Sequence, residues 1–174
     1  MLQPIPTRYR GCQFLSRLEA RWAVFFDALD LEWDYEPEGF ILPSGECYLP
    51  DFYLPQVRMY AEVKPCECRD EVVVPPDARR KLCDLAQAIG RPVILCDGTP
   101  RDTNYWTAWP QPGEDYPTWE DVVFTDLHRY HLVEGRLFAS TGGGLFRHDW
   151  PHEDCNHPAV AAARSARFEH GARV

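Results

Sequence analysis

Tyr60-Ala61-Glu62-Val63-Lys64-Pro65 places an acid and a base at the end of an otherwise apolar strand. Side chains alternate along a strand, so Glu62 and Lys64 point to one face while Ala61 and Val63 point to the other. A buried charge is costly unless it is paired or binds a metal. The stretch therefore predicts a strand that ends where these two charges have a partner or a ligand.

A second short run, residues 48–54, precedes this strand and predicts an antiparallel hairpin with it. With the turn centred near residues 55 and 56, Asp51 is expected opposite Tyr60, which shares a face with Glu62. Asp51 and Glu62 would then be diagonal neighbours, about 7–8 Å apart. Two carboxylates at that spacing can share a Mg²⁺ or Mn²⁺ ion, and Lys64 on the same face can hold a water or a phosphate oxygen.

The arrangement of Pro50-Asp51 and Glu62-Val63-Lys64 resembles the signature of the PD-(D/E)XK nucleases, the restriction-endonuclease-like superfamily. Both motifs fall on predicted strands that the hairpin brings together, and a predicted helix with Glu19 precedes them. The resemblance covers about residues 8–100. It implies an α/β fold with the restriction-endonuclease-like core, in which a helix, a three-stranded antiparallel meander, a second helix and a strand follow one another.

Three further runs resemble a group of small phage and bacterial proteins, whose pattern is similar to transposon end-cleaving endonucleases and Holliday-junction-type resolvases: residues 16–26, 35–40 and 48–52. The resemblance implies a Mg²⁺- or Mn²⁺-dependent endonuclease that hydrolyses phosphodiester bonds of DNA, in phage or mobile-element DNA processing. Asp51 and Glu62 would bind the metal, with the Val63 carbonyl as a further ligand. Lys64 would orient the attacking water or neutralise the phosphate.

Residues 14–29 predict an amphipathic helix, because apolar residues recur at steps of three and four. The stripe consists of Leu18, Trp22, Phe25, Phe26 and Leu29. Ser16 and Glu19 match a capping box, which is one role for Glu19. The other role is as a third acid at the metal site, directly or through water, since Glu19 matches the helix glutamate of many nucleases in the superfamily.

Three cationic side chains are candidates for nucleic-acid binding. Arg17 and Arg21 lie on the outer side of the first predicted helix, where they contact phosphates or form a solvated face. Lys81 lies on a second predicted helix, near the place where some superfamily members carry a basic or amide residue close to the scissile phosphate. An ordinary solvated helix face is the favoured alternative for Lys81.

The rest of the first hundred residues predicts the remaining core elements. Residues 31–42 predict an edge strand whose regular pairing ends at Pro37. Residues 77–88 predict the second helix, with Gly90 as its C-terminal cap. Residues 92–96 are wholly apolar and predict a short strand in a buried, parallel position.

The amino-acid composition changes after residue 100. We therefore predict a nuclease core over residues 1–100 and an α+β extension over residues 101–174 that packs on the core. The extension is rich in proline and aromatic residues, whose acidic neighbours favour a role in covering the core over stacking on bases. Residues 122–138 predict a hairpin, and residues 158–168 predict a C-terminal helix.

Composition limits the class of protein. The net charge of −9 argues mildly against broad non-specific nucleic-acid binding, although a bound metal inverts the local potential of an acidic site. The chain contains neither an apolar run of about 18 residues nor a signal-peptide pattern, which predicts a cytoplasmic protein of a bacterial or phage-infected cell without membrane contact. Seven cysteines in such a protein predict thiols and no disulfide framework.

Two groups of cysteine and histidine residues are candidate structural zinc sites. Cys66 and Cys68 are separated by one residue and have only Cys83 and Cys96 as partners, which fits zinc spacing poorly. The denser group near the C-terminus consists of His148, His152, Cys155 and His157. Its spacing allows a Zn²⁺ ion that ties down the tail, although a polar loop is favoured.

Two functions from other classes stay open at the level of sequence. The first is a catalytically silent module that binds nucleic acid or a protein partner on the same fold. The second is an acidic, phage-encoded inhibitor that mimics phosphate and binds a basic host protein, which would suit the net charge of −9. An intact set of Asp51, Glu62 and Lys64 favours the nuclease. A homodimer is also left open.

Overall fold

The computed structural model describes residues 4–65, 76–100, 104–110, 118–123, 130–133, 136–139 and 158–168. It has a mixed α/β fold built on a six-stranded mixed sheet. The helices are α1 (Arg17–Ala28), α2 (Pro76–Ile89) and α3 (Pro158–Ser165). The strands of the large sheet are, in spatial order, β10 (Thr118–Val123), β9 (Asn104–Trp109), β8 (Val93–Asp97), β7 (Met59–Lys64), β6 (Phe52–Leu54) and β3 (Asp34–Tyr35).

Three two-stranded sheets accompany the large one. They pair β1 (Thr7–Tyr9) with β2 (Cys12–Phe14), β4 (Phe40–Ile41) with β5 (Cys47–Tyr48), and β11 (Tyr130–Val133) with β12 (Arg136–Ala139). The β11–β12 pair confirms the hairpin predicted within residues 122–138. In the described part of the chain, no helix has the length and apolar character needed to cross a bilayer.

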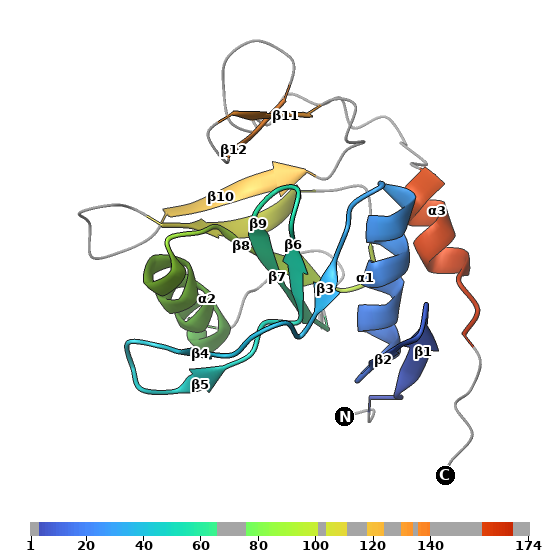
Figure 1. The fold of residues 1–174 in the computed structure, drawn as a ribbon, viewed down its shortest axis with the longest axis horizontal. Helices are drawn as coiled ribbons and strands as arrows, with labels where there is room; N and C mark the ends of the chain where they lie inside the picture. Colours follow the sequence, from blue (N-terminus) through green and yellow to red (C-terminus); the bar gives the residue numbers. More distant parts are fainter. Residues whose placement is uncertain are drawn as a thin grey trace.

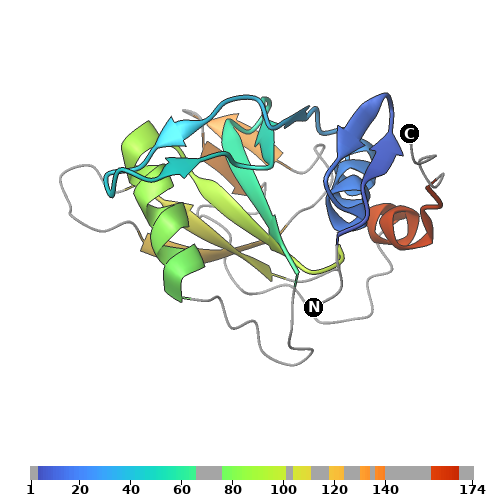
Figure 2. The same cartoon turned by 90° about the horizontal axis from the view of Figure 1, so that it is seen from below.

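Helices cover both faces of the large sheet (Figures 1 and 2). On one face α1 buries the predicted stripe, including Trp22 and Phe26, against Phe52, Ala61 and Val63. On this side α3 packs beside α1, confirming the predicted C-terminal helix. On the other face α2 packs its own apolar residues against the sheet. That second cluster includes Leu82, Leu85, Tyr60, Val93 and Leu95.

The central hairpin departs from its predicted register. In the structure Leu54 pairs with Met59 and Phe52 with Ala61, so that one further step along the register sets Asp51 opposite Glu62. The prediction that Asp51 lies opposite Tyr60 is therefore wrong by two residues. A register shift of two preserves the face of every side chain, so Asp51 and Glu62 still share a face.

The longer turn between β6 and β7 explains the shift. Residues 55–58 form the turn, in which Arg58 N–H donates to the Pro55 carbonyl at 3.2 Å and Arg58 has a φ of 52°. Val57 is only 4% exposed and belongs to the apolar cluster under α1. Burial of Val57 therefore keeps this residue in the turn and prevents it from extending the strand.

The predicted antiparallel meander is present as β3, β6 and β7, with an insertion. The predicted strand over residues 31–42 is wrong in its extent, because only β3 pairs with β6 and the chain then leaves the sheet. Glu36 has a φ of 46° just before Pro37, which ends the regular pairing. The departing chain forms the β4–β5 hairpin, which turns at Gly45 (φ 84°) and returns to Asp51.

The second half of the core follows the sequence prediction closely. α2 contains the predicted helix, and Gly90 follows it with a φ of 63°. β8 runs parallel to β7 and all five of its residues are buried, confirming the buried parallel strand. β9 and β10 then extend the same sheet, so the segment predicted as an extension supplies one of the sheet's edges.

Candidate functional site

The predicted site residues Asp51, Glu62 and Lys64 meet at one end of the large sheet. Asp51 directly precedes β6, and Glu62 and Lys64 are among the last three residues of β7. Because β6 and β7 are antiparallel, the start of one strand lies beside the end of the other. Directly opposed residues in such a pair have Cβ atoms about 4.5–5.5 Å apart, which is closer than the diagonal arrangement predicted from sequence.

Glu62 is a buried carboxylate whose two oxygens differ in their hydrogen bonding. Its side chain is only 5% exposed, and Oε1 accepts a hydrogen bond from Lys64 Nζ. Within the described residues, Oε2 is buried and has no hydrogen-bond partner. A buried carboxylate oxygen without a donor carries a desolvation cost that a ligand would relieve. Glu62 is therefore suited to bind a cation through Oε2.

Asp51 is held next to this oxygen by the backbone of β7. Its Oδ2 accepts a hydrogen bond of 2.7 Å from the Val63 N–H. Burial first and the Glu62 carboxylate second raise the pKa of Asp51 to about 8, against the opposing effects of the Val63 N–H and Lys64. Two buried carboxylates that repel each other in this way favour a shared proton or a divalent cation.

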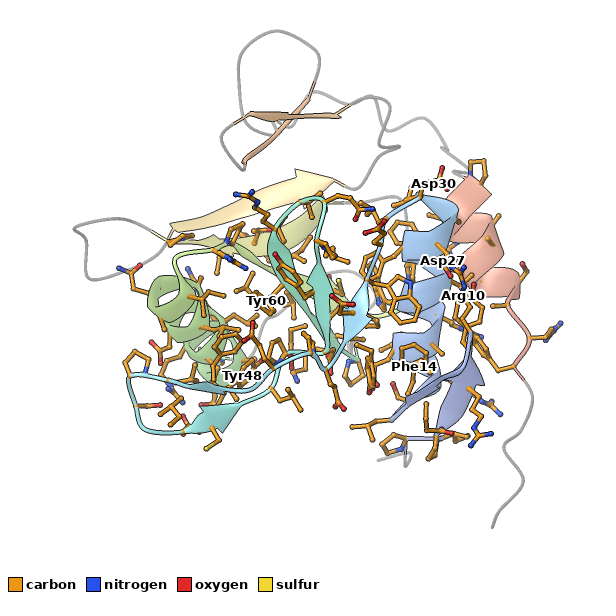
Figure 3. The ribbon with its side chains drawn as sticks, viewed as in Figure 1. Arg10, Phe14, Asp27, Asp30, Tyr48 and Tyr60 are labelled. Carbon is orange, nitrogen blue, oxygen red and sulfur yellow. The ribbon has the colours of Figure 1, made fainter. Side chains whose placement is uncertain are left out.

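Tyr48, for which the sequence suggested no role, adds a phenol to the site. It lies on β5, in the layer between the sheet and α2, where Figure 3 also shows Tyr60. Burial raises the pKa of Tyr48, and the charge of Glu62, a side-chain hydrogen bond to Glu62 and then the charge of Asp51 raise it further. The phenol therefore stays protonated and faces the two carboxylates as a neutral donor. The β4–β5 insertion that brings it there gave no signal in the sequence.

Glu19 has the capping-box geometry. Glu19 N–H donates to Ser16 Oγ at 3.1 Å, and Ser16 Oγ in turn donates to Glu19 Oε1 at 2.5 Å. The other oxygen, Oε2, accepts from the Leu15 N–H at 3.1 Å and from the Tyr35 hydroxyl at 2.6 Å. Both oxygens are thus occupied, although the charge of Glu19 is close enough to raise the pKa of Asp51 after burial and Glu62 have done so.

The described residues contain no group of three or more His, Cys, Asp or Glu side chains arranged to hold a metal ion. Asp51 and Glu62 are therefore a pair, with Glu19 outside direct reach in this arrangement. A pair of carboxylates suits Mg²⁺, which keeps several waters and binds through one or two carboxylates in many phosphate-transfer sites. The Oε2 atom of Glu62 and the raised pKa of Asp51 fit such an ion.

Asp97 is a second residue that sequence reasoning missed. It is the last residue of β8, is 4% exposed, and pairs in parallel register with Lys64. Burial raises the pKa of the neighbouring Cys96 thiol, and the charges of Asp97, Asp51 and Glu62 raise it further. The charges of all three acids therefore reach Cys96, although Cys96 itself packs in the cluster under α1. The predicted strand stopped at residue 96, one residue before this acid.

The candidate nucleic-acid contacts differ in their exposure. Arg17 is exposed and Arg21 is half-buried on α1. Lys81 is engaged on α2, where its Nζ lies 3.2 Å from Glu46 Oε1 and 3.3 Å from Asp77 Oδ2. Lys81 therefore ties the β4–β5 hairpin to α2, as expected for an ordinary helix face.

The candidate zinc ligands lie mostly outside the described residues. These are Cys66, Cys68, His148, His152, Cys155 and His157. Of the other two cysteines considered, Cys83 is half-buried and Cys96 is buried, and both are thiols outside any disulfide.

Comparisons with protein-family models, curated proteins and solved structures gave no match for this chain.

Proposed function

We propose that this protein is a metal-dependent nuclease that hydrolyses DNA phosphodiester bonds with a PD-(D/E)XK-type site. The observation that carries the proposal is the pairing of Asp51 with Glu62. Asp51 is half-buried and Glu62 is buried, one register step beyond the Phe52–Ala61 pair, and within the described residues Glu62 Oε2 lacks a hydrogen-bond partner. Lys64 supplies a cation at the same place. If no ligand bound here, an apolar residue would be expected at one of these two positions.

The order of elements supports the same proposal. Helix α1, the antiparallel strands β3, β6 and β7, helix α2 and the parallel strand β8 follow one another along the chain. This is the order that the resemblance implies for a restriction-endonuclease-like core. The site lies at the ends of the central strands, where such sheets commonly carry functional side chains.

The proposed chemistry assigns each residue a task. Asp51 and Glu62 would hold Mg²⁺ or Mn²⁺, with the Val63 carbonyl as a further ligand and Glu19 acting through water. The bound ion supplies an activated water and neutralises charge on the phosphate. Lys64 Nζ orients the attacking water or contacts a phosphate oxygen. Exposed Arg17, near the same end of the fold, is a candidate phosphate contact, and Arg21 is a weaker one.

A binding module without catalysis is the second candidate. It is favoured by the net charge of −9 and by the neutralised cations of α2. Arg80 lies 2.7 Å from Glu46 and 2.9 Å from Asp77, and Lys81 pairs with the same two acids. An acidic surface of this kind would suit a basic protein partner.

Cleavage of a panel of linear, nicked, branched and single-stranded DNA with Mg²⁺ or Mn²⁺ tests the nuclease. Lys64→Ala and Asp51→Ala are the diagnostic variants, and Asp34→Ala, an exposed acid on β3, is the matched control. Cutting by wild type and Asp34→Ala that both diagnostic variants lose would support the proposal. Absence of cutting on every substrate, with equal DNA binding by all four proteins, would favour the binding module.

A further inference from the structure

Asp97 and Lys64 are neighbours on adjacent central strands. In the parallel register of β7 and β8, Glu62 pairs with Leu95, Val63 with Cys96, and Lys64 with Asp97. Leu95 belongs to the cluster under α2, whereas Val63 and Cys96 belong to the cluster under α1. The alternation of faces therefore holds to the ends of both strands, so Lys64 and Asp97 follow Glu62 and Leu95 on the α2 face.

The backbone keeps this neighbourhood fixed. Gly98 N–H donates to the Lys64 carbonyl at 2.7 Å, directly after the paired residue Asp97. Gly98 has a φ of 66°, a left-handed conformation that glycine adopts without strain. The Gly98 carbonyl then accepts from Trp22 Nε1 at 2.9 Å, which anchors it to the core of α1. Asp97 is thus a rigidly placed, buried carboxylate beside a more mobile lysine.

Lys64 and a metal ion compete for the same acid. Lys64 Nζ donates to Glu62 Oε1, while its side chain is 45% exposed and has room to move. A divalent ion between Asp51 and Glu62 would repel the ammonium and weaken that hydrogen bond. The ammonium then needs another anion within reach, and adjacent strands lie only about 4.8 Å apart.

We propose that Asp97 is a positioning residue that receives the Lys64 ammonium when a divalent cation binds between Asp51 and Glu62. The inference rests on the proposed function and adds a second state of Lys64. In the first state Lys64 neutralises Glu62. In the second it lies between Asp97 and the substrate phosphate, ready to contact that phosphate. No covalent step is involved, since only hydrogen bonds and ion pairs change.

The test is a double-mutant cycle on Mn²⁺ affinity, measured by isothermal titration calorimetry at fixed pH. Lys64→Gln removes the competitor and is expected to tighten Mn²⁺ binding by about 3- to 10-fold. Asp97→Asn removes the alternative anion and is expected to weaken binding by a similar factor. In the Lys64→Gln background, Asp97→Asn is expected to have no effect, because there is no displaced ammonium to receive.

Additive behaviour overturns the inference. If Asp97→Asn weakens Mn²⁺ binding equally with and without Lys64, Asp97 acts only as a general negative charge. An unchanged affinity in Asp97→Asn overturns it as well. Asp97→Glu should restore the wild-type affinity, and thermal melting of each variant in the absence of metal shows whether it is folded. If Asp97→Asn does not fold, Asp97→Ser, which also removes the carboxylate, takes its place in the cycle, with the same coupling expected.

The same titration separates this inference from the proposed function. A wild type that binds Mn²⁺ and cuts DNA, with an additive cycle, overturns the role of Asp97 alone. A wild type that neither binds Mn²⁺ nor cuts DNA overturns the nuclease and the role of Asp97 together.

Discussion

Two carboxylate sites near opposite ends of α1, Asp27 at one and the Asp51–Glu62 pair at the other, behave differently. At the C-terminal end, Asp27 accepts hydrogen bonds from the Tyr9 hydroxyl at 2.7 Å, Arg10 Nη1 at 2.6 Å and Trp33 Nε1 at 3.1 Å (Figure 3). Asp27 therefore joins the β1–β2 hairpin to α1 and to the chain entering β3. Both of its oxygens have donors, which is the pattern of a structural carboxylate.

At the other end, Asp51 and Glu62 lie close enough for their charges to repel, and donors reach them only in part. Asp51 has one backbone donor, and in the described residues Glu62 Oε2 has none. Glu19 resembles Asp27 in this respect, because both of its oxygens are hydrogen-bonded. We infer from this comparison that a carboxylate whose two oxygens both accept hydrogen bonds stabilises the fold. A carboxylate with an oxygen that accepts none is suited to bind a ligand. Each prediction below tests that distinction.

The largest expected effect is on cleavage. Glu62→Gln should lower the cleavage rate by about 10²–10³-fold or more, since it removes charge where the metal and the phosphate are neutralised. Single-turnover cleavage at saturating Mg²⁺ measures this rate. Asp27→Asn is the matched control and should cut at the wild-type rate per folded molecule. Equal losses in the two variants would contradict the distinction.

The second effect is on stability. Asp27→Ala leaves the Tyr9 hydroxyl and Trp33 Nε1 without their acceptor, which should lower the free energy of unfolding by about 2–3 kcal/mol. Urea denaturation of the metal-free protein measures it. Glu62→Gln should change the free energy of unfolding by less than Asp27→Ala, because it relieves repulsion with Asp51 while weakening the contact with Lys64. A larger loss in Glu62→Gln would show that Glu62 is the structural acid.

The third effect is a pH dependence that Asp51 causes. Burial and the Glu62 charge raise its pKa to about 8 from the usual 3.8. The folded state therefore binds a proton that the unfolded state releases, and stability should fall as pH rises from about 4 to about 8. Denaturation midpoints of the metal-free protein across this range measure the slope.

Asp51→Asn should flatten that slope, and Mg²⁺ should stabilise the wild type most at and above pH 8, where it no longer competes with the proton. A slope that persists unchanged in Asp51→Asn would assign the titration to another group.

The smallest effect concerns Glu19. Glu19→Gln keeps the side-chain length but weakens the hydrogen bonds to Ser16, Leu15 and Tyr35, which should cost about 1–2 kcal/mol of stability. Its Mn²⁺ affinity should fall by less than about 10-fold if Glu19 acts only through water. Calorimetric titration measures that affinity. A loss as large as that of Glu62→Gln would make Glu19 a direct ligand.

Local patterns predicted much of this fold. The stripe on α1, the cap at Ser16 and the apolar run of β8 are short-range features, and each appears where the sequence places it. The register of the β6–β7 hairpin was missed because turn length depends on burial of Val57 and the left-handed conformation of Arg58. Neither property can be read from residue types alone.

The sequence also predicted that Asp51, Glu62 and Lys64 come together, because their spacing matches two paired strands. Tyr48 and Asp97 were missed because their proximity to Glu62 and Lys64 depends on the β4–β5 insertion and on the parallel pairing of β7 with β8. Such tertiary contacts bring together residues that no local pattern connects.

A crystal structure of the wild-type protein soaked in Mn²⁺, with anomalous diffraction data, tests the central claim most directly. An anomalous peak about 2 Å from Glu62 Oε2 and from an oxygen of Asp51, with Lys64 Nζ moved away from Glu62, is the predicted result. A peak elsewhere, or no peak at this pair in a crystal whose Asp51 and Glu62 remain side by side, would contradict it.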